Sequence, residues 1–182
     1  SPGDIGKTGD GSFYTEYTSF SISKALKPGT AENEALLADI DFMAQKLKQV
    51  QDAGVPILWR PLHEAEGGWF WWGAEGPEAC VELYRLLYDK LTNEYKLNNL
   101  IWVWTSYDYD TSPAWYPGDD VVDIVGYDKY NAKDGLPNGS AISSTFYNLV
   151  QLTGGKKLVA MTENDTIPRV QNLIDEKAGW LY

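Results

Sequence analysis

The sequence has little of several things that whole classes of protein require. One cysteine, Cys80, means that no disulfide can form within the chain. One histidine, His63, excludes a zinc site built mainly from histidines. The longest apolar runs are four or five residues, far short of the roughly 20 that a membrane-spanning helix needs. No glycine-rich phosphate loop follows an apolar run, which counts against a nucleotide-binding sheet.

Positive charge is scarce as well. The 182 residues carry 15 Lys and Arg against 26 Asp and Glu, for a net charge of −11. Such a chain repels phosphate backbones, so nucleic acid is excluded as a partner. The acidic balance suits a soluble protein that acts on a neutral polymer, although many soluble proteins share it. The opening residues, Ser1-Pro2-Gly3-Asp4, contain no signal peptide, which a mature secreted chain would also lack.

Aromatic side chains are abundant instead, with eight Trp and twelve Tyr. Such rings stack on the faces of sugars, but they also build hydrophobic cores. Composition alone therefore leaves both interpretations open.

The apolar pattern alternates between helices and short strands. Apolar residues at three- and four-residue steps predict a helix over 31–53, with Thr30 as its N-cap and Gly54 as its stop. Strands are predicted at 55–61, 99–104, 121–126 and 157–161, further helices at 77–96, 142–153 and 168–177, a mainly irregular segment at 1–30, and the start of a fifth strand at 178–182. Continuous apolar strands between helices indicate a parallel α/β sheet, either a barrel or a doubly wound sheet.

The number of strands bears on that choice. A closed eight-stranded barrel takes about 250 residues, whereas four or five strands are predicted here. The pattern therefore favours part of a barrel, with residues 1–182 forming one domain.

Polar side chains follow two of the predicted strands. Arg60, His63, Glu64 and Glu66 come after the first strand, and Glu163 comes after the fourth. In a barrel these positions lie at the C-terminal strand ends, where active sites form, and three strands apart they face one another across the mouth. Facing carboxylates are the basic equipment of glycoside hydrolysis, one protonated and one ionised.

Simpler interpretations remain open for these residues. A glutamate after a strand is often just the favoured first residue of a helix, and Glu66 could serve as the acid in place of Glu64. The cluster Trp69–Trp72 could be core packing. His63-Glu64 suggests a metallopeptidase, but that motif needs a second histidine at position 67, which is glycine.

Two pairs of aspartates are the remaining candidates for metal binding. Asp108 with Asp110, and Asp119 with Asp120, are predicted to be turn residues. A calcium site is the alternative.

Several segments together resemble one family. They are Trp59-Arg60-Pro61-Leu62-His63-Glu64, Gly68-Trp69-Phe70-Trp71-Trp72-Gly73, Asn99-Leu100-Ile101-Trp102-Val103-Trp104, Trp115-Tyr116-Pro117-Gly118-Asp119-Asp120, Asp123-Ile124-Val125-Gly126-Tyr127-Asp128-Lys129-Tyr130 and Thr162-Glu163-Asn164. In this order, from about Asp4 onward, they resemble glycoside hydrolase family 26.

The resemblance implies a fold and a set of roles. The fold would be a (β/α)₈ TIM barrel, present here as about strands 4 to 8. Glu64, at the end of the fourth strand, would be the acid/base, and Glu163, at the end of the seventh, the nucleophile of a retaining double displacement. The implied substrate-binding residues are Arg60 and His63, which orient the site, Trp69, which stacks on a sugar, Tyr130, which hydrogen-bonds near the nucleophile, and Trp72 and Trp104, which line a subsite or wall.

The function that the resemblance implies is a retaining endo-β-1,4-mannanase that cuts mannan, glucomannan or galactomannan. It would need no cofactor and no metal, and it would act outside the cell because polymeric mannan cannot enter one. Binding or docking modules outside this chain are left open. The alternatives are a β-1,3-1,4-glucanase, a β-1,3-xylanase, or a non-catalytic carbohydrate-binding domain.

The chain departs from the family pattern in two respects. Family members carry a further strand upstream of Ser1 and an aromatic-rich strand beyond Tyr182, both of which build sugar subsites. Many relatives also have Asn or Ser where Glu66 stands, and an extra carboxylate there would change the polarity of a subsite.

Overall fold

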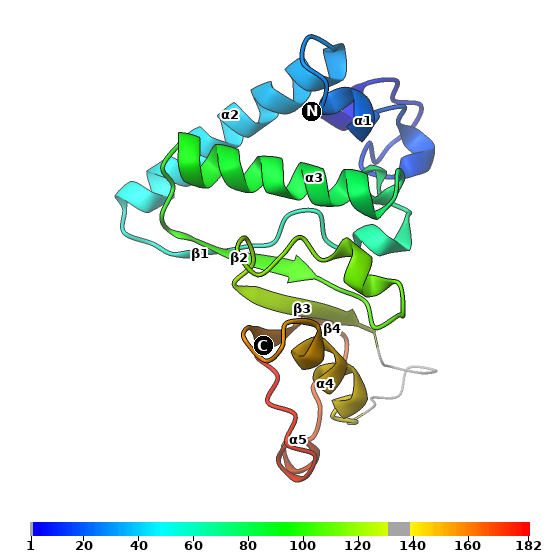
Figure 1. Ribbon diagram of the computed structural model, residues 1–182, viewed down its shortest axis with the longest axis vertical. Coiled ribbons are helices and arrows are strands. Elements are labelled where there is room, and N and C mark those ends of the chain that lie inside the picture. The colour runs from blue at the N-terminus through cyan, green and yellow to red at the C-terminus, as the bar shows by residue number, and fades with distance from the viewer. Residues whose placement is uncertain (1, 131–138) are drawn as a thin grey trace.

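The fold is built on a single parallel sheet, seen in a computed structural model that describes residues 2–130 and 139–182. The strands β1 (Ile57–Trp59), β2 (Leu100–Thr105), β3 (Ile124–Lys129) and β4 (Leu158–Asn164) lie side by side in chain order, each parallel to the next (Figure 1). All four predicted strands are therefore present. The predicted fifth strand is reduced to one parallel bridge, between Leu181 and Ala160.

The helices are α1 (Ile22–Ala25), α2 (Ala31–Asp52), α3 (Pro77–Tyr88), α4 (Ser143–Leu152) and α5 (Val170–Asp175), with a π-helical turn over Asp89–Glu94 that continues α3. Short 3₁₀ turns are η1 (Pro2–Asp4), η2 (Thr15–Tyr17), η3 (Ala65–Gly67), η4 (Trp71–Gly73) and η6 (Ser112–Trp115). Helix α3 lies between β1 and β2, and α4 lies between β3 and β4, as crossovers between parallel strands usually do, while the described chain between β2 and β3 forms only a 3₁₀ turn. Thr30 caps α2 as predicted, since its hydroxyl accepts from the backbone N–H of Asn33 at 3.1 Å.

The third strand begins at Ile124, three residues later than predicted. Val121 and Val122 are buried, but they pack into the core from the turn before the strand. The Asp123 side chain accepts from the backbone N–H of Trp102 at 2.8 Å, which ends that turn. Apolar residues in a buried turn and in a strand give the same sequence pattern, so the boundary was missed.

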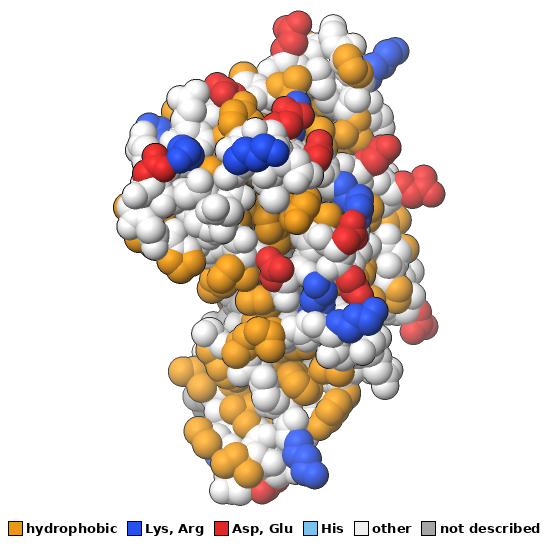
Figure 2. All heavy atoms as spheres, turned by 60° about the vertical axis from the view of Figure 1, so that its left-hand side comes forward, with side chains coloured by type: hydrophobic (Ala, Val, Ile, Leu, Met, Phe, Trp, Pro, Cys, Tyr) orange, Lys and Arg blue, Asp and Glu red, His pale blue; other side chains and the backbone are white. Residues whose placement is uncertain are grey.

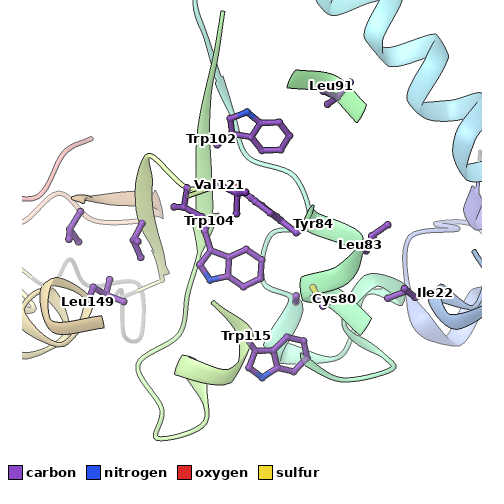
Figure 3. Close-up of a cluster of buried hydrophobic side chains, with 14 of the residues drawn as sticks. Ile22, Cys80, Leu83, Tyr84, Leu91, Trp102, Trp104, Trp115, Val121 and Leu149 are labelled. Carbon is purple, nitrogen blue, oxygen red and sulfur yellow. The ribbon is translucent and has the colours of Figure 1, made fainter. Parts of the chain in front are cut away.

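The core lies between β2 and α3. Trp102 and Trp104 point from β2 toward α3, and each ring centroid lies 5.5 Å from that of Tyr84 (Figure 3). Cys80 and Leu83 are fully buried beside them, so the cysteine is a core residue as predicted.

The opposite face of the sheet is the concave one. A smaller apolar cluster of Val103, Ile124 and Ala160 lies there. Side chains alternate between faces along a strand. Consequently each strand presents one set of residues to the helices and another to the barrel interior.

Exposed apolar side chains gather at the edges of this sheet. Leu58 in β1 and Leu158 in β4 are 67% and 60% exposed. Figure 2 shows hydrophobic side chains concentrated at the lower end of the view, the end that carries α5 in Figure 1. Among the described residues, no helix combines the length and the hydropathy that a membrane span requires.

Candidate active site

Three carboxylates meet where the strands end. One oxygen from each of Glu64, Asp128 and Glu163 lies within 4.8 Å of the other two. They come from the segment after β1, from β3 and from β4. The structure thus brings together the two glutamates predicted to face each other and adds a third acid between them.

A bulge in β4 aims Glu163 into this site. Tyr127 of β3 pairs with Met161, but the next residue, Asp128, pairs with Glu163, so Thr162 is an extra residue in β4. Met161 packs in the core on the helix side. Simple alternation would send Glu163 to that side too, but the extra residue places Glu163 on the concave side.

The Thr162 side chain also points to the concave side. Its hydroxyl donates to Asp128 at 2.5 Å. Gly126 opposite leaves the necessary room, since a Cβ there would lie 2.5 Å from the Thr162 side chain. Glycine at 126 is therefore required by close approach and not by its own backbone conformation.

Arg60 links three strand ends. Its guanidinium donates to Thr105 at 2.9 Å, to Asp128 at 3.0 Å, and to Glu163. The side chain is 23% exposed and the Asp128 side chain only 1%, so these ion pairs are well shielded from solvent. One cation thereby offsets the charge of two acids.

Two donors keep Glu163 ionised. Tyr130 donates its hydroxyl hydrogen to Glu163 at 2.6 Å, and Arg60 donates from the other side. Burial alone would raise the pKa of Glu163, but the hydrogen bonds from Tyr130 and Arg60 outweigh it, and the pKa lies below its usual value. An ionised carboxylate at this position is able to act as a nucleophile.

Glu64 sits on a strained backbone. It has φ 53° and ψ 29°, and Leu62 two residues earlier also has a positive φ of 56°. The left-handed conformation costs a residue with a Cβ roughly 1–2 kcal/mol. Strain of this kind persists where the surrounding fold imposes it and is frequent at functional sites.

The surroundings of Glu64 favour its neutral form. Burial raises its pKa, and the charges of Asp128 and Glu163 raise it further. The neighbouring Trp69 side chain acts in the opposite direction and lowers the pKa, but by less. A raised pKa lets a carboxylic acid hold its proton to higher pH, which is what a general acid requires.

Asp128 was missed by the sequence analysis as a site residue. It is 8% exposed, and burial raises its pKa despite the hydrogen bonds from Thr162 and Arg60. A signal was present, because residues 124, 126 and 128 share the concave face of β3 and the last of them is acidic. Its carboxylate touches both the predicted acid and the cation beside the predicted nucleophile.

Aromatic rings hold His63 in place. Its ring lies 5.0 Å from that of Phe70 and 5.7 Å from that of Trp72, and Trp72 Nε1 donates to the His63 carbonyl at 2.8 Å. Burial and the charge of Arg60 lower the pKa of His63, so the imidazole is neutral at neutral pH. Trp72 thus helps to fix the position of His63.

Trp69 is 43% exposed and meets Tyr107 edge-on at 6.2 Å. It lies close enough to Glu64 to lower the pKa of that carboxyl, so its ring is beside the predicted acid. An exposed ring in this position suits stacking on a sugar next to the bond to be cut.

Two expectations change. The prediction that Trp104 lines the site was wrong, since its ring is 1% exposed and points toward α3 (Figure 3). The Glu66 carboxylate accepts from the hydroxyls of Thr111 and Ser112 at 2.6 and 2.7 Å. Glu66 therefore ties two loops together, which disfavours it as an alternative acid.

Three of the four aspartates considered for calcium make other contacts. Asp108 accepts from Thr145 and Asn148, Asp119 from Tyr116 and Lys156, and Asp120 from Arg85. These partners favour a structural role over a calcium site. The cluster of Glu64, Asp128 and Glu163 does have the donors for a cation, but a divalent ion would have to displace Arg60.

Comparison with known proteins places this geometry in context. The family model described as glycosyl hydrolase family 26 matches residues 4–182. A mannan endo-1,4-β-mannosidase of Thermothelomyces thermophilus is 49% identical over 172 residues, which are 93% of this chain and 34% of that protein. The chain therefore spans about a third of the length of this curated relative.

Solved structures agree. A ruminal endo-β-1,4-mannanase of family 26 is 44% identical with a TM-score of 0.88, covering 93% of this chain and 38% of that one. A β-mannanase from a protist symbiont of the termite Reticulitermes speratus, complexed with a gluco-manno-oligosaccharide, is 38% identical with a TM-score of 0.87, covering 99% and 53%. The predicted fold is confirmed: the four parallel strands are part of a (β/α)₈ barrel.

Proposed function

Because the chain belongs to glycosyl hydrolase family 26, we propose that it is the catalytic part of a retaining endo-β-1,4-mannanase. The observation that carries this proposal is a pair of glutamates in one site, of which only Glu163 accepts hydrogen bonds from Arg60 and Tyr130. Glu64 is shifted toward its protonated form and Glu163 toward its ionised form. These are the two states that the first step of a double displacement requires.

In that first step Glu163 attacks the anomeric carbon. The glycosidic bond breaks, the leaving oxygen takes the proton of Glu64, and a covalent glycosyl-enzyme forms. The closeness of the carboxylates supports this route, because inverting enzymes separate theirs by about 6.5–9.5 Å to hold a water, whereas oxygens of Glu64 and Glu163 lie within 4.8 Å.

In the second step water attacks the anomeric carbon. Glu64, now ionised, takes a proton from that water, and the bond to Glu163 breaks, which restores both residues. Asp128 acts indirectly in both steps, because it accepts a hydrogen bond from Arg60 and lies beside the carboxyl of Glu64. Tyr130 and Arg60 keep Glu163 ionised until it attacks.

The substrate is proposed from the relatives and from the aromatic wall. The relatives described above are named as mannanases, and one is complexed with a gluco-manno-oligosaccharide. Trp69 offers an exposed ring beside Glu64 for the sugar on the leaving-group side. Mannan or glucomannan is therefore the proposed polymer.

The test is an assay of new reducing ends on glucomannan, lichenan and β-1,3-xylan, with Glu163→Gln as the inactive control. We expect release from glucomannan alone, with products of mixed length and the initial anomer retained by NMR. Cleavage of lichenan or xylan in preference to glucomannan would replace the mannanase proposal by the corresponding family member. Activity that survives in Glu163→Gln would refute the assigned nucleophile.

The wider setting is proposed on chemical grounds. Polymeric mannan does not cross a membrane, so the protein is proposed to act outside the cell, together with any binding or docking modules outside this chain. Residues 1–182 remain predicted to form one domain. Recovery of the protein from the cell interior instead of the culture medium would contradict the extracellular location.

A further inference from the structure

A groove separate from the carboxylates lies between the loop after β2 and helix α4. Its volume is about 440 Å³, and residues 107–110, 112, 113, 148, 149, 151 and 152 line it. None of Glu64, Asp128 and Glu163 belongs to this lining. Between β2 and β3 the described chain forms only the short turn η6 (Ser112–Trp115), which leaves the groove beside α4 open.

The groove does not depend on the open edges of the sheet. Its walls belong to the segments that follow β2 and β3, and each of these strands pairs with a neighbour on both sides. The described residues that line the groove therefore do not belong to an unpaired edge of the sheet.

A pair of stacked tyrosines forms one wall. The rings of Tyr107 and Tyr109 lie 5.4 Å apart at an interplanar angle of 11°. Tyr109 is 62% exposed, while Tyr107 is half-buried behind it and also touches Trp69 edge-on. Aromatic rings thus run without a break from Trp69, beside Glu64, to the groove.

The loop that carries these rings is held from both sides. Asp108 accepts from Thr145 and Asn148 of α4, each at 2.7 Å. On the other side Glu66 accepts from Thr111 and Ser112. A ligand would therefore meet a preformed surface, which reduces the ordering cost of binding.

The polar groups of the groove define the chemistry that it accepts. Asp110, Asn148 and Gln151 are exposed and offer acceptors and amide donors. Among the described residues that line the groove there is no lysine or arginine, and the chain carries a net charge of −11, so an anionic ligand is disfavoured. A fixed ring face next to such groups suits a sugar, which presents an apolar face and a rim of hydroxyls.

We propose that this groove is a second binding site for neutral β-linked hexose units, beyond the sugar that stacks on Trp69. The inference rests on the proposed function in one respect, because the same polymer would occupy both sites. It assigns Tyr109 as the stacking platform, and Asp110 and Gln151 as groups that hydrogen-bond to hydroxyls.

The experiment uses the full chain carrying Glu163→Gln, so that nothing is cut. Amide hydrogen exchange is measured with and without β-1,4-mannohexaose. We expect slower exchange over 107–113 and 148–152 as well as near Glu64. In this background, Tyr109→Ala should weaken the binding of mannohexaose, measured from the protection of the groove, by about five- to tenfold. Phe42→Ala, which removes an exposed ring on α2, should leave this binding unchanged.

The outcomes separate this inference from the proposed function. Protection near Glu64 without protection of the groove would overturn the second site and leave the enzyme proposal standing. Groove protection that is lost in Tyr109→Ala, in a chain that cuts no polymer, would support the site while the proposed activity fails. Groove protection unchanged by Tyr109→Ala, or equally strong with an oligogalacturonate, would overturn the assigned platform or the neutral ligand class.

Discussion

The ends of β1 and β4 present the same side chain in surroundings that shift its pKa in opposite directions. Glu64 follows β1 on a left-handed backbone, and burial and two neighbouring acids raise its pKa. Glu163 follows a bulge in β4, and two donors lower its pKa. Solvent exposure does not explain the difference between the two glutamates, since both are half-buried. The difference comes from Arg60 and Tyr130, which donate to one glutamate and not to the other.

The largest effect is expected when each of the two carboxylates is removed in turn. Glu163→Ala and Glu64→Ala should each lower turnover of glucomannan by roughly 10³–10⁵-fold. With an aryl β-mannoside, whose phenolate departs without a proton from Glu64, azide should restore turnover in both, yielding an α-mannosyl azide with Glu163→Ala and a β-mannosyl azide with Glu64→Ala. Product NMR distinguishes the two. Glu82→Gln, on the exposed face of α3, serves as the unaffected control, and identical azide products from both variants would contradict the assigned roles.

A second test removes the cation that separates the two states. Arg60→Met should lower kcat about 100-fold or more and destabilise the fold by about 3–5 kcal/mol, because it leaves the buried Asp128 unpaired. The pKa of Glu163 should rise toward that of Glu64. Kinetics and denaturant titration measure both effects. Arg60→Lys keeps the positive charge but lacks the several N–H donors of the guanidinium, so it should recover part of the stability. A stable, active Arg60→Met variant would refute this role of Arg60.

A milder change removes one donor. Tyr130→Phe should raise the pKa of Glu163, so the acidic limb of the pH–kcat/KM profile moves to higher pH, with a larger loss of kcat/KM at pH 5 than at pH 7. Glu163 contributes stability above its unfolded pKa of about 4.3, and that contribution is lost as pH falls through its lower folded pKa. Tyr130→Phe should reduce this contribution of Glu163 to the free energy of unfolding. The Tyr130 pKa of about 12 means that its own proton does not titrate in this range. An unchanged acidic limb would show that the hydrogen bond does not set the pKa.

The smallest expected effect concerns backbone strain. Lys96 has a φ of 57°, like Glu64, but it is exposed and far along the chain from the site. Lys96→Gly should stabilise the protein by about 1 kcal/mol and raise Tm by roughly 2–4 °C without changing turnover. Lys46→Gly, inside the right-handed helix α2, should instead destabilise it by about 1 kcal/mol. Thermal melting checks both, and altered turnover in Lys96→Gly would show that this position is coupled to the site.

Much of the fold was predictable because local signals were consistent. The N-cap at Thr30, the apolar periodicity of α2 and the four apolar runs led to the correct order of helices and strands. The two glutamates followed from their positions after strands in a barrel. Boundaries were less certain, as the buried turn at Val121 and Val122 shows.

The errors at the site had one physical origin. The face to which a strand residue points depends on register, which the sequence does not display. Trp104 was placed in the wall, although alternation sends it to the helix side. Asp128 was overlooked, although alternation sends it to the concave side. The tyrosine pair at 107 and 109 depends on a loop conformation fixed by Asp108 and Glu66, which no local pattern revealed.

The bulge at Thr162 links the direction of Glu163 to the length of β4. If Thr162 paired regularly with Asp128, Glu163 would turn to the helix side, away from Arg60, even with every side chain kept. Deleting Thr162 would leave Glu163 opposite Asp128 but would remove the hydroxyl that donates to Asp128. Adding one residue and pairing all of them regularly would move Glu163 past Asp128 along the strand. Sequence change in β4 is therefore constrained in length as well as in residue type.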